Sequence, residues 1–399
     1  MARTLAELPK GSRLTDYISL GVIAATFPLA KVHDILRQTQ RTSERQRDLP
    51  AHVVIYYVIA LALYMQSSYQ EVLRCLLEGI RWLFGPGDTL KITGRSGISQ
   101  ARTRLGAEPL ARLYNEVVAP IAQAQTRGAW YHTWKVVSID GTTLDVADTD
   151  ENEKEFGRPT ASRGNSGFPQ VRLVSLVENG THVLFGSQIA GCRTGEGRLA
   201  DLAISSLREG MLCLADRYYF SYKRWNQAAK PGVAFLWRVK AGMNLPCNRR
   251  LADGSYLSKI YRSTYDRQKD RKGVVVRVIE YTLEGVAGAE PLYRLLTTIL
   301  DPAEAPANEL AALYHERWEI ETALDELKTH LRGARIVLRS KTPELVRQEV
   351  YGLLLAHFAI RGLMHEAALK GDVDVDQLSF LHSVRVVRRK LQRFVAASP

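Results

Sequence analysis

The chain has 399 residues, of which 46% are hydrophobic, and its 54 Lys and Arg residues outnumber 42 Asp and Glu residues to give a formal net charge of +12 at pH 7. This length allows two or three domains with their own cores, and no apolar run reaches the roughly 18 residues that a membrane-spanning helix needs. The excess of cations favours a polyanion as partner, most simply nucleic acid, over a membrane surface. A basic enzyme unrelated to nucleic acid stays open on charge alone.

The four cysteines are dispersed along the chain, with no C-x-x-C pair. This spacing argues against a zinc site or a disulfide framework and favours a reducing compartment. The first residues, MARTLAELPKGSR, lack the basic-then-apolar pattern of a signal peptide. We therefore expect a cytoplasmic protein.

The first 125 residues are predicted to be mostly helical. Apolar residues at helical spacing predict helices at 14–23, 53–65 and 71–84. Residues 96–118 combine a helix-start signal with an amphipathic pattern and predict one further helix. Arg102 and Arg104 within it could contact phosphate or be solvated helix charges.

From Trp134 the sequence changes to short, β-branched, alternating runs separated by Gly and Asn-Gly, which is typical of adjacent antiparallel strands. These runs are WKVVSID, TTLDVAD, PQVRLVSLVE and HVLFGSQIAG. A helical stretch (197–209), a strand ending in an acid (211–216), a short helix (221–229) and another strand (233–240) follow. Adjacent strands followed by a helix, a strand, a helix and a strand is the order of a ribonuclease H-like sheet.

The helix that would complete such a sheet is delayed by residues 241–306. This insertion is strand-like and basic, and its cations are Arg262, Arg267, Lys269, Arg271, Lys272 and Arg277. After Arg332 the chain is predicted to be helical again, ending in SVRVVRRKLQRF. The cations of the insertion and of this terminal segment either contact DNA or are solvated.

The delayed helix carries an unusual polar stripe. Tyr314, Arg317, Glu321 and Lys328 are separated by gaps of two, three and six residues. On a helix that turns roughly 100° per residue they fall within about a 60° arc. One face would then carry a carboxylate flanked by a phenol, a guanidinium and an amine, a combination suited to metal-dependent phosphate chemistry.

Two further carboxylates end or nearly end predicted strands, Asp140 after VVSI and Asp216 after MLCLA. Together with Glu321 they can hold two divalent ions for in-line phosphoryl displacement, and Mg²⁺ suits such all-oxygen ligands. Each residue also has a simpler interpretation. Asp140 with Gly141 could form a hairpin turn, Asp216 with Arg217 a strand-end ion pair, and Glu321 could be a solvated helix charge. Asp145, Asp148 and Asp150 follow the strand in an apparent loop and are not candidates.

SIDGTTL around Asp140, LADRYYFSY around Asp216 and the ungapped Y-R-E-K pattern resemble the bacterial D-D-E transposases of the insertion-sequence-four family. The resemblance covers most of residues 130 to 335. It implies an α/β, ribonuclease H-like mixed sheet flanked by helices, interrupted by a β-rich insertion and preceded by an α-helical domain. The implied domains are a helical, DNA-end-binding 1–125, a catalytic 130–345 with its insertion at 241–306, and a helical C-terminal segment at 346–399.

The resemblance also implies residue roles. Asp140, Asp216 and Glu321 would be the catalytic residues and the ligands of two Mg²⁺ ions, with Mn²⁺ as an alternative ion. Tyr314, Arg317 and Lys328 would bind phosphates of the DNA end, although core packing for Tyr314 and an ion pair for Lys328 are the simpler roles. Family members stack a flipped base on an aromatic residue, for which Trp237 and Trp318 are candidates, with core packing the alternative for each.

The predicted function is therefore a DNA transposase that cleaves and joins strands by a cut-and-paste mechanism. Its partners would be double-stranded DNA, as terminal inverted repeats and target, and a second copy of the chain in a homodimeric synaptic complex. A hydrolytic nuclease on the same fold is one alternative. A catalytically silent DNA-binding repressor derived from a transposase is another.

Overall fold

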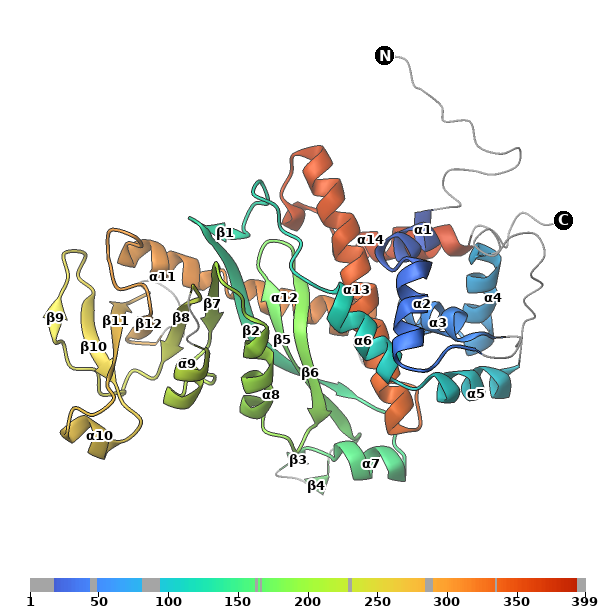
Figure 1. The fold of residues 1–399 in the computed structure, drawn as a ribbon, viewed down its shortest axis with the longest axis horizontal. Helices are drawn as coiled ribbons and strands as arrows, with labels where there is room; N and C mark the ends of the chain where they lie inside the picture. The colour runs from blue at the N-terminus through green and yellow to red at the C-terminus, as the bar shows by residue number, and fades with distance from the viewer. Residues whose placement is uncertain are drawn as a thin grey trace, which may run out of the picture. The chain divides into compact units, whose positions relative to one another are not determined.

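The computed structural model describes residues 18–43, 49–80, 94–161, 164–165, 167–228, 232–283, 290–333 and 336–392 (Figure 1). The chain divides into two compact units. One contains Met1–Ala119, Leu144–Gln170 and Asp325–Pro399, and the other contains Pro120–Thr143 and Val171–Leu324. None of the helices in the described part of the chain has the length and apolar character that crossing a membrane requires.

The first unit is mainly helical. Its elements are α1 (Ile18–Thr26), α2 (Leu29–Gln38), α3 (Ala51–Leu63), α4 (Tyr69–Ile80), α5 (Arg95–Leu105), α6 (Glu108–Val117), α7 (Asp150–Phe156), β3 (Thr160–Ala161), β4 (Gly164–Asn165), η3 (Glu326–Leu331), α13 (Pro343–Gly371), η4 (Val375–Gln377) and α14 (Phe380–Gln392). The long helix α13 packs against α3 and α6, and α14 packs against α1 and α13 (Figure 1). The apolar helix α3 is buried from Val53 to Leu63, so it forms the centre of this unit.

The N-terminal helices differ from the sequence prediction at one point. Residues 96–118 form two helices rather than one, because Gly106 adopts a φ of 72° and Pro109 then stands in the first turn of α6. The side chain of Glu344 accepts a hydrogen bond from the Ala107 amide at 2.6 Å and stabilises this break. The predicted helical residues 14–17 and 81–84 lie outside the described residues.

The second unit is built on a mixed sheet. Its elements are β1 (Trp130–Tyr131), β2 (Trp134–Asp145), β5 (Gln170–Glu178), β6 (Val183–Gly191), α8 (Glu196–Ala203), η2 (Ile204–Ser206), β7 (Met211–Ala215), α9 (Tyr222–Ala228), β8 (Ala234–Val239), β9 (Arg249–Arg250), β10 (Tyr256–Ile260), α10 (Thr264–Gln268), β11 (Val274–Tyr281), β12 (Tyr293–Thr297), α11 (Ala307–His315) and α12 (Trp318–Asp325). Ten strands of the described residues pair in the order β6-β5-β2-β7-β8-β12-β11-β10-β9, with β1 beside β2.

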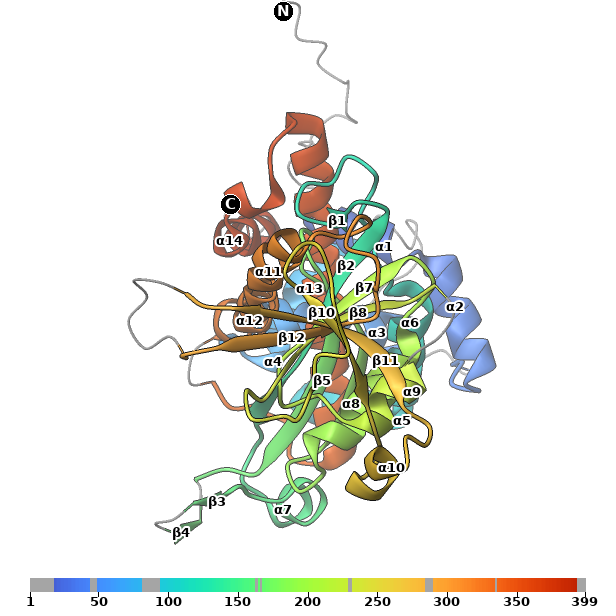
Figure 2. The same ribbon diagram turned by 90° about the vertical axis from the view of Figure 1, so that its left-hand side faces the viewer.

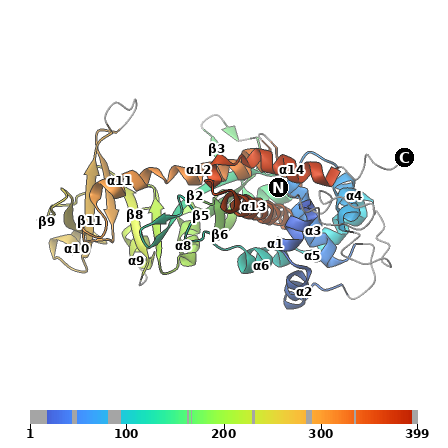
Figure 3. The same cartoon turned by 90° about the horizontal axis from the view of Figure 1, so that it is seen from above.

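The first half of this order is the predicted ribonuclease H-like arrangement. Strands β5 and β6 are antiparallel, whereas β2, β7 and β8 are parallel neighbours. Helices α8 and α9 lie on one face of these strands, and α11 and α12 lie on the other (Figures 2 and 3). This is the fold class that the order of strands and helices predicts.

The insertion does not form a separate sheet. Its strands β9 to β12 continue the sheet of β2, β7 and β8, because β12 pairs antiparallel with β8 and β11 pairs antiparallel with β12. The core beneath this junction combines residues from both parts: Leu214, Leu236, Ile279, Leu295 and Leu310.

Strand β2 is longer than predicted. It runs without interruption through Asp140 and Gly141, so the hairpin turn considered for this pair is not formed. Gly141 is required here by packing: a Cβ atom at this position would lie 2.7 Å from Glu196 Oε1 and 3.2 Å from the Leu173 carbonyl oxygen. The Asp-Gly pair therefore reflects a close approach within the sheet.

The predicted final helix is not one regular helix. Helix α11 ends at His315, and the next turn is bonded from residue i to residue i+3, with Arg317 N donating to the Tyr314 carbonyl at 3.2 Å. Helix α12 follows, and Glu326–Leu331 (η3) is π-helical. The assumption of a constant 100° step from Tyr314 to Lys328 is therefore wrong.

Candidate active site

Strand register brings two of the predicted metal ligands together. In the parallel pair β2–β7, Ile139 is opposite Ala215, and Asp140 and Asp216 are the residues that follow them. Adjacent strands lie about 4.8 Å apart, so the two carboxylates project from neighbouring positions at one edge of the sheet. Ala215 is in turn opposite Trp237 on β8, which places Arg238 next in the same row.

Asp140 is held by local hydrogen bonds. Its Oδ1 accepts from the Gly141 amide at 2.8 Å and from the Tyr219 hydroxyl at 3.2 Å. Burial raises the pKa of Asp140 from its usual value, and the nearby Glu196 carboxylate acts in the same direction. The Gly141 and Tyr219 hydrogen bonds and the charge of Arg317 oppose this rise in pKa without cancelling it.

Tyr219 joins two carboxylates. Its hydroxyl contacts Glu196 Oε1 as well as Asp140 Oδ1, and the residue is only 1% exposed. A phenol carries one proton and can donate to one of these oxygens at a time.

Asp216 faces cations. The Arg238 guanidinium lies 3.9 Å from Asp216 Oδ1, and Arg238 also forms a 2.7 Å ion pair with Glu290. Glu290 further pairs with Arg217 at 2.8 Å, so the predicted Asp216–Arg217 strand-end pair is replaced by an Arg217–Glu290 pair. Asp216 Oδ1 is buried and has no hydrogen-bond partner among the described residues.

Arg317 connects Glu321 to Asp140 electrostatically. Glu321 lies on α12, is about half exposed, and receives Arg317 Nη2 at 3.3 Å from its Oε1. Arg317 itself is only 9% exposed, and its positive charge acts to lower the pKa of Asp140. The guanidinium also lies over the ring of Trp318, 5.2 Å from its centroid.

The other two members of the predicted stripe have different surroundings. Tyr314 is buried in the apolar core, as the simpler interpretation expects, and its hydroxyl donates to the Ala215 carbonyl at 3.4 Å. Burial raises the pKa of Tyr314 above its usual value. Lys328 is half-buried on η3, where its own carbonyl accepts from Arg332 Nε at 3.2 Å.

The donor set suits a hard divalent cation. Asp140 and Asp216 supply oxygen ligands from adjacent strand ends, and Asp216 Oδ1 is a buried oxygen without a hydrogen bond. Within the described ranges, no three His, Cys, Asp or Glu side chains are gathered closely enough to hold a metal ion. Glu321 instead points its carboxylate at Arg317.

Several sequence-based roles are now changed. Trp237 is fully buried in the core, as expected, but Trp318 is 58% exposed, so core packing for it is wrong. Arg102 is 2% exposed and donates to Gln348 and Ser340, which excludes both a solvated and a phosphate-binding role. Arg277 of the insertion is fully buried and is likewise neither solvated nor available to DNA.

Sequence reasoning missed Glu196, Tyr219, Arg238 and Glu290. Tyr219 had a signal, since it follows Asp216 by three residues in LADRYYFSY and is directed back toward the strand end. Glu196 begins helix α8, where a carboxylate normally reflects the helix dipole rather than a site. Only the packing of α8 against β6 and the sheet reveals its contact with Tyr219.

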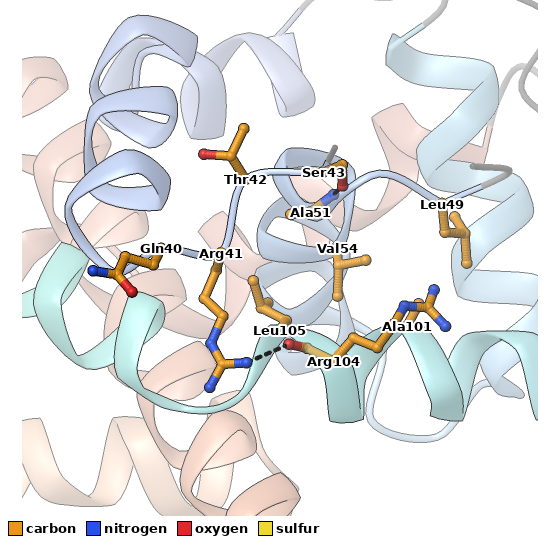
Figure 4. A pocket seen from close by; sticks show the side chains of 10 residues that line it. All are labelled: Gln40, Arg41, Thr42, Ser43, Leu49, Ala51, Val54, Ala101, Arg104 and Leu105. Carbon is orange, nitrogen blue, oxygen red and sulfur yellow. Dashed lines mark hydrogen bonds between the residues drawn. The ribbon is translucent and has the colours of Figure 1, made fainter. Parts of the chain in front are cut away.

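A cavity of about 270 Å³ lies within the first unit, between the segment around Arg41 and helix α5 (Figure 4). Arg41 Nη1 donates to the Arg104 carbonyl at 3.2 Å, and Ser43 Oγ accepts from the Ala51 amide at 2.9 Å. Leu49, Val54 and Leu105 form its apolar wall. None of the described residues that line it is a carboxylate, so it is no candidate for the metal site.

Comparisons with known proteins agree with the architecture. Residues 133–359 match the model of the transposase DDE domain, and residues 17–115 match that of the insertion element 4 transposase N-terminal region. The chain is 30% identical to the transposase InsG for insertion sequence element IS4 of Escherichia coli K12, over 91% of this chain and 81% of that protein. It is 25% identical to the putative transposase InsZ of the same organism, over 57% and 73%.

One solved structure resembles the fold at low sequence identity. It is the synaptic complex of the piggyBac transposase with hairpin DNA, which aligns with a TM-score of 0.50 at 11% identity. The alignment covers 97% of this chain and 84% of that chain.

Proposed function

Because the chain belongs to the insertion-sequence-4 family of DDE transposases and is therefore a DNA transposase, we propose that Asp140, Asp216 and Glu321 form its catalytic centre. The observation that carries this proposal is the strand register that sets Asp140 beside Asp216. Two carboxylates on adjacent strands need only one more from a neighbouring helix to complete an all-oxygen site, and Glu321 lies on such a helix.

Asp140, Asp216 and Glu321 would hold divalent cations, Mg²⁺ in the first instance and Mn²⁺ as an alternative. When two such ions are bound, they activate the attacking oxygen and stabilise the leaving oxygen of an in-line displacement. The Arg317 guanidinium contacts the Glu321 carboxylate, and a metal ion bound by Glu321 would replace this guanidinium as the neighbouring cation. With Glu321 holding a divalent ion, Arg317 would be available to bind a phosphate of the DNA.

The remaining residues of the site bind and orient the DNA. Arg317 offers a planar fork that fits two phosphate oxygens, while Lys328 acts as a point charge. The Tyr314 hydroxyl holds the Ala215 carbonyl through a long bond of 3.4 Å, which a phosphate oxygen can replace. Tyr219, whose hydroxyl also contacts Glu196, would orient the carboxylate of Asp140.

The proposed reaction has two stages, hydrolysis and then strand transfer. Water first attacks the phosphodiester at the element end, which leaves a 5′-phosphate and a free 3′-hydroxyl. That hydroxyl then attacks a second phosphodiester, in the opposite strand or later in the target DNA, and displaces its 3′-oxygen. Both stages need the same groups in the same positions, so a single site serves cleavage and strand transfer. The substrates are the terminal inverted repeats and the target duplex, brought together by a homodimer.

The test is cleavage and strand transfer on a duplex that carries one terminal repeat, with Mg²⁺ present. Asp140→Asn, Asp216→Asn and Glu321→Gln should each lower the cleavage rate by at least about a thousandfold and leave DNA binding intact. Asp150→Asn is the matched control, because Asp150 is an exposed carboxylate in the first turn of α7. Cleavage by any of the three variants at the rate of the control would remove that residue from the catalytic centre.

The same assay separates the alternatives. A hydrolytic nuclease would cleave the duplex without joining its 3′-end to a second DNA, and a silent repressor would bind the repeat without cleaving it. A transposase gives both the nicked product and the joined product.

A further inference from the structure

The helical unit contains a second, larger cavity of about 560 Å³. It lies between the turn after α3, the end of the π-helical segment η3 and helix α14. Its volume is that of a typical ligand pocket. Its lining contains three arginines, Arg332, Arg385 and Arg388, together with the imidazole of His330, and no carboxylate is among the described residues that line it.

Arg332 is the buried member of this lining. The residue is only 4% exposed, and its Nη1 is buried without a hydrogen-bond partner among the described residues. Its Nε donates to the Lys328 carbonyl at 3.2 Å, which fixes the orientation of the guanidinium. Burial lowers the pKa of Arg332, while the charge of Asp145 acts in the opposite direction. A buried guanidinium with an unused donor leaves an energetic cost that a bound anion would remove.

Helix α14 adds two more guanidiniums. Arg388 donates to the Leu331 carbonyl at 3.1 Å and to the Leu63 carbonyl, so it joins two walls of the cavity. The Tyr64 hydroxyl donates to the Arg388 carbonyl at 2.9 Å and holds the helix in place. Arg385 is one turn earlier on the same helix and is exposed.

The positive charges in this cavity repel one another. Burial lowers the pKa of Arg388, and the neighbouring charge of Arg385 lowers it further. His330 also lines the cavity, and its Nε2 lies 3.5 Å from Asp325 Oδ2. An oxyanion between the arginines would turn this repulsion into attraction.

We propose that the cavity formed by Arg332, Arg385 and Arg388 binds a phosphodiester group of the DNA backbone. DNA is chosen over a small anion because Arg385 is exposed at the cavity and belongs to SVRVVRRKLQRF, a run of cations too long for one phosphate ion. Arg393 in this run lies outside the described residues. The inference rests on the proposed function only in taking DNA as the substrate, and it adds a contact outside the carboxylate centre.

The test measures the affinity of the full chain for a labelled random-sequence duplex, without divalent ions, over a series of salt concentrations. Arg385→Ala should weaken binding by roughly three- to tenfold and reduce the slope of log affinity against log salt by about 0.9, the value for one phosphate contact. Arg332→Lys keeps the charge but loses the fork, so it should weaken binding with little change in slope.

Lys370→Ala is the matched control, because Lys370 is a cation of the same unit whose side chain is 75% exposed and pairs with Glu366. Because the Arg385 side chain is exposed, Arg385→Ala should fold normally, so that a change in its DNA affinity reports a lost contact. Binding by both arginine variants that equals the Lys370 variant in affinity and slope would overturn the proposal.

A second measurement separates DNA from a small anion. Inorganic phosphate should raise the melting temperature of the wild-type chain more than that of Arg385→Ala and should compete with the duplex. If the Arg385 variant loses the response to phosphate but binds DNA normally, the site takes a free anion and the DNA assignment is wrong. Failure of the carboxylate centre gives a different result, namely normal cleavage by Asp140→Asn, Asp216→Asn or Glu321→Gln.

Discussion

Arg317 interacts with two of the proposed metal ligands, Glu321 and Asp140. Its Nη2 lies 3.3 Å from Glu321 Oε1, and its Cζ lies 5.2 Å from the centroid of the Trp318 ring. Its charge also interacts with that of Asp140. Its Nε is buried without a hydrogen-bond partner among the described residues. A metal ion at Glu321 would free the guanidinium from the first of these contacts, and the remaining ones would limit its rotamer freedom, which lowers the entropic cost of binding a phosphate.

Replacement of Arg317 should therefore affect DNA more than the fold. We expect Arg317→Ala to lower affinity for the end duplex about tenfold and to reduce the salt slope by about 0.9, measured by fluorescence anisotropy. Arg317→Lys should recover the slope and only part of the affinity, because an ammonium cannot form two parallel hydrogen bonds. Lys328→Ala should reduce the slope by a similar amount. Salt slopes equal to that of the wild-type chain would contradict a phosphate role for both residues.

Tyr219 is the residue through which Asp140 is oriented, and Tyr218 provides its control. Tyr219→Phe removes a hydroxyl that contacts both Asp140 and Glu196. We expect this variant to need about tenfold more Mg²⁺ for half-maximal cleavage, because groups that orient a metal ligand typically contribute 10- to 100-fold to affinity. Tyr218 is 59% exposed, and Tyr218→Phe should leave the Mg²⁺ requirement unchanged. A titration in which the two variants coincide would assign Tyr219 a purely structural role.

At the scale of elements, one buried ion pair connects the insertion to the start of α11. Arg277 on β11 pairs with Asp253 and donates to the Ala305 carbonyl at 2.7 Å. Asp253 also accepts from the Ala307 amide at 2.9 Å, the first residue of α11. The insertion thereby fixes where the helix that leads to Glu321 begins.

We expect Asp253→Asn to lower the free energy of unfolding by about 3 kcal/mol, because it leaves the fully buried Arg277 without a compensating charge. Chemical denaturation followed by tryptophan fluorescence measures this loss. The control is Asp270→Asn, which breaks an exposed pair with Lys259 and should not change stability measurably. Equal midpoints for the two variants would show that Arg277 is stabilised by its carbonyl contacts alone.

The same pair predicts a pH dependence. Burial acts to raise the pKa of Asp253, but hydrogen bonds from Ser255 and Ala307 and the charge of Arg277 outweigh it, so the pKa lies below its usual value of 3.8. A carboxylate with a lowered pKa stabilises the fold fully above the unfolded value and loses that contribution as the pH falls through the folded value. The difference between the wild-type chain and Asp253→Asn should therefore be constant above about pH 5 and should shrink below pH 3.8.

The elements also show how far the sequence alone could lead. Alternation and turn residues predict the strands because they depend on local chemistry, and the order of elements then indicates the sheet. The continuity of β2 could not be predicted, since the Asp140–Gly141 signal for a turn is local whereas the Glu196 oxygen that excludes a Cβ is distant in sequence. The uneven helix from Tyr314 to Lys328 was also hidden, because residue spacing does not reveal a change from i+4 to i+3 and i+5 bonding.

The whole molecule has a formal charge of +12, which favours binding to DNA of any sequence, and the proposed reaction also takes DNA as its substrate. A polycation of this kind binds any duplex with an affinity that falls steeply with salt. Cut-and-paste transposition additionally requires two ends to be joined to one target. One proposed carboxylate centre would act on one DNA end at a time, so we expect two chains to assemble on two ends.

Light scattering coupled to size-exclusion chromatography tests this assembly. With Glu321→Gln and the end duplex, in Mg²⁺, the complex should have the mass of two chains and two duplexes, whereas a random duplex should give only salt-sensitive, heterogeneous binding. A complex of one chain and one duplex that still supports strand transfer by the wild-type chain would exclude the dimer. Moderate salt is needed in both runs, because it suppresses the sequence-independent binding.

The pairing of β12 with β8 has a mechanical consequence for the insertion. A domain joined by two linkers could pivot about them, but here Leu236–Val239 and Arg294–Thr297 form a backbone ladder in the same sheet that carries Asp216. Rotation of the insertion about β8 would break the hydrogen bonds of that ladder, so the insertion is as rigid as the sheet to which it belongs. Amide hydrogens on β8 and β12 should therefore exchange with solvent together. A force that bound DNA exerts on the insertion would be transmitted through the sheet and would twist the strands that carry Asp140 and Asp216.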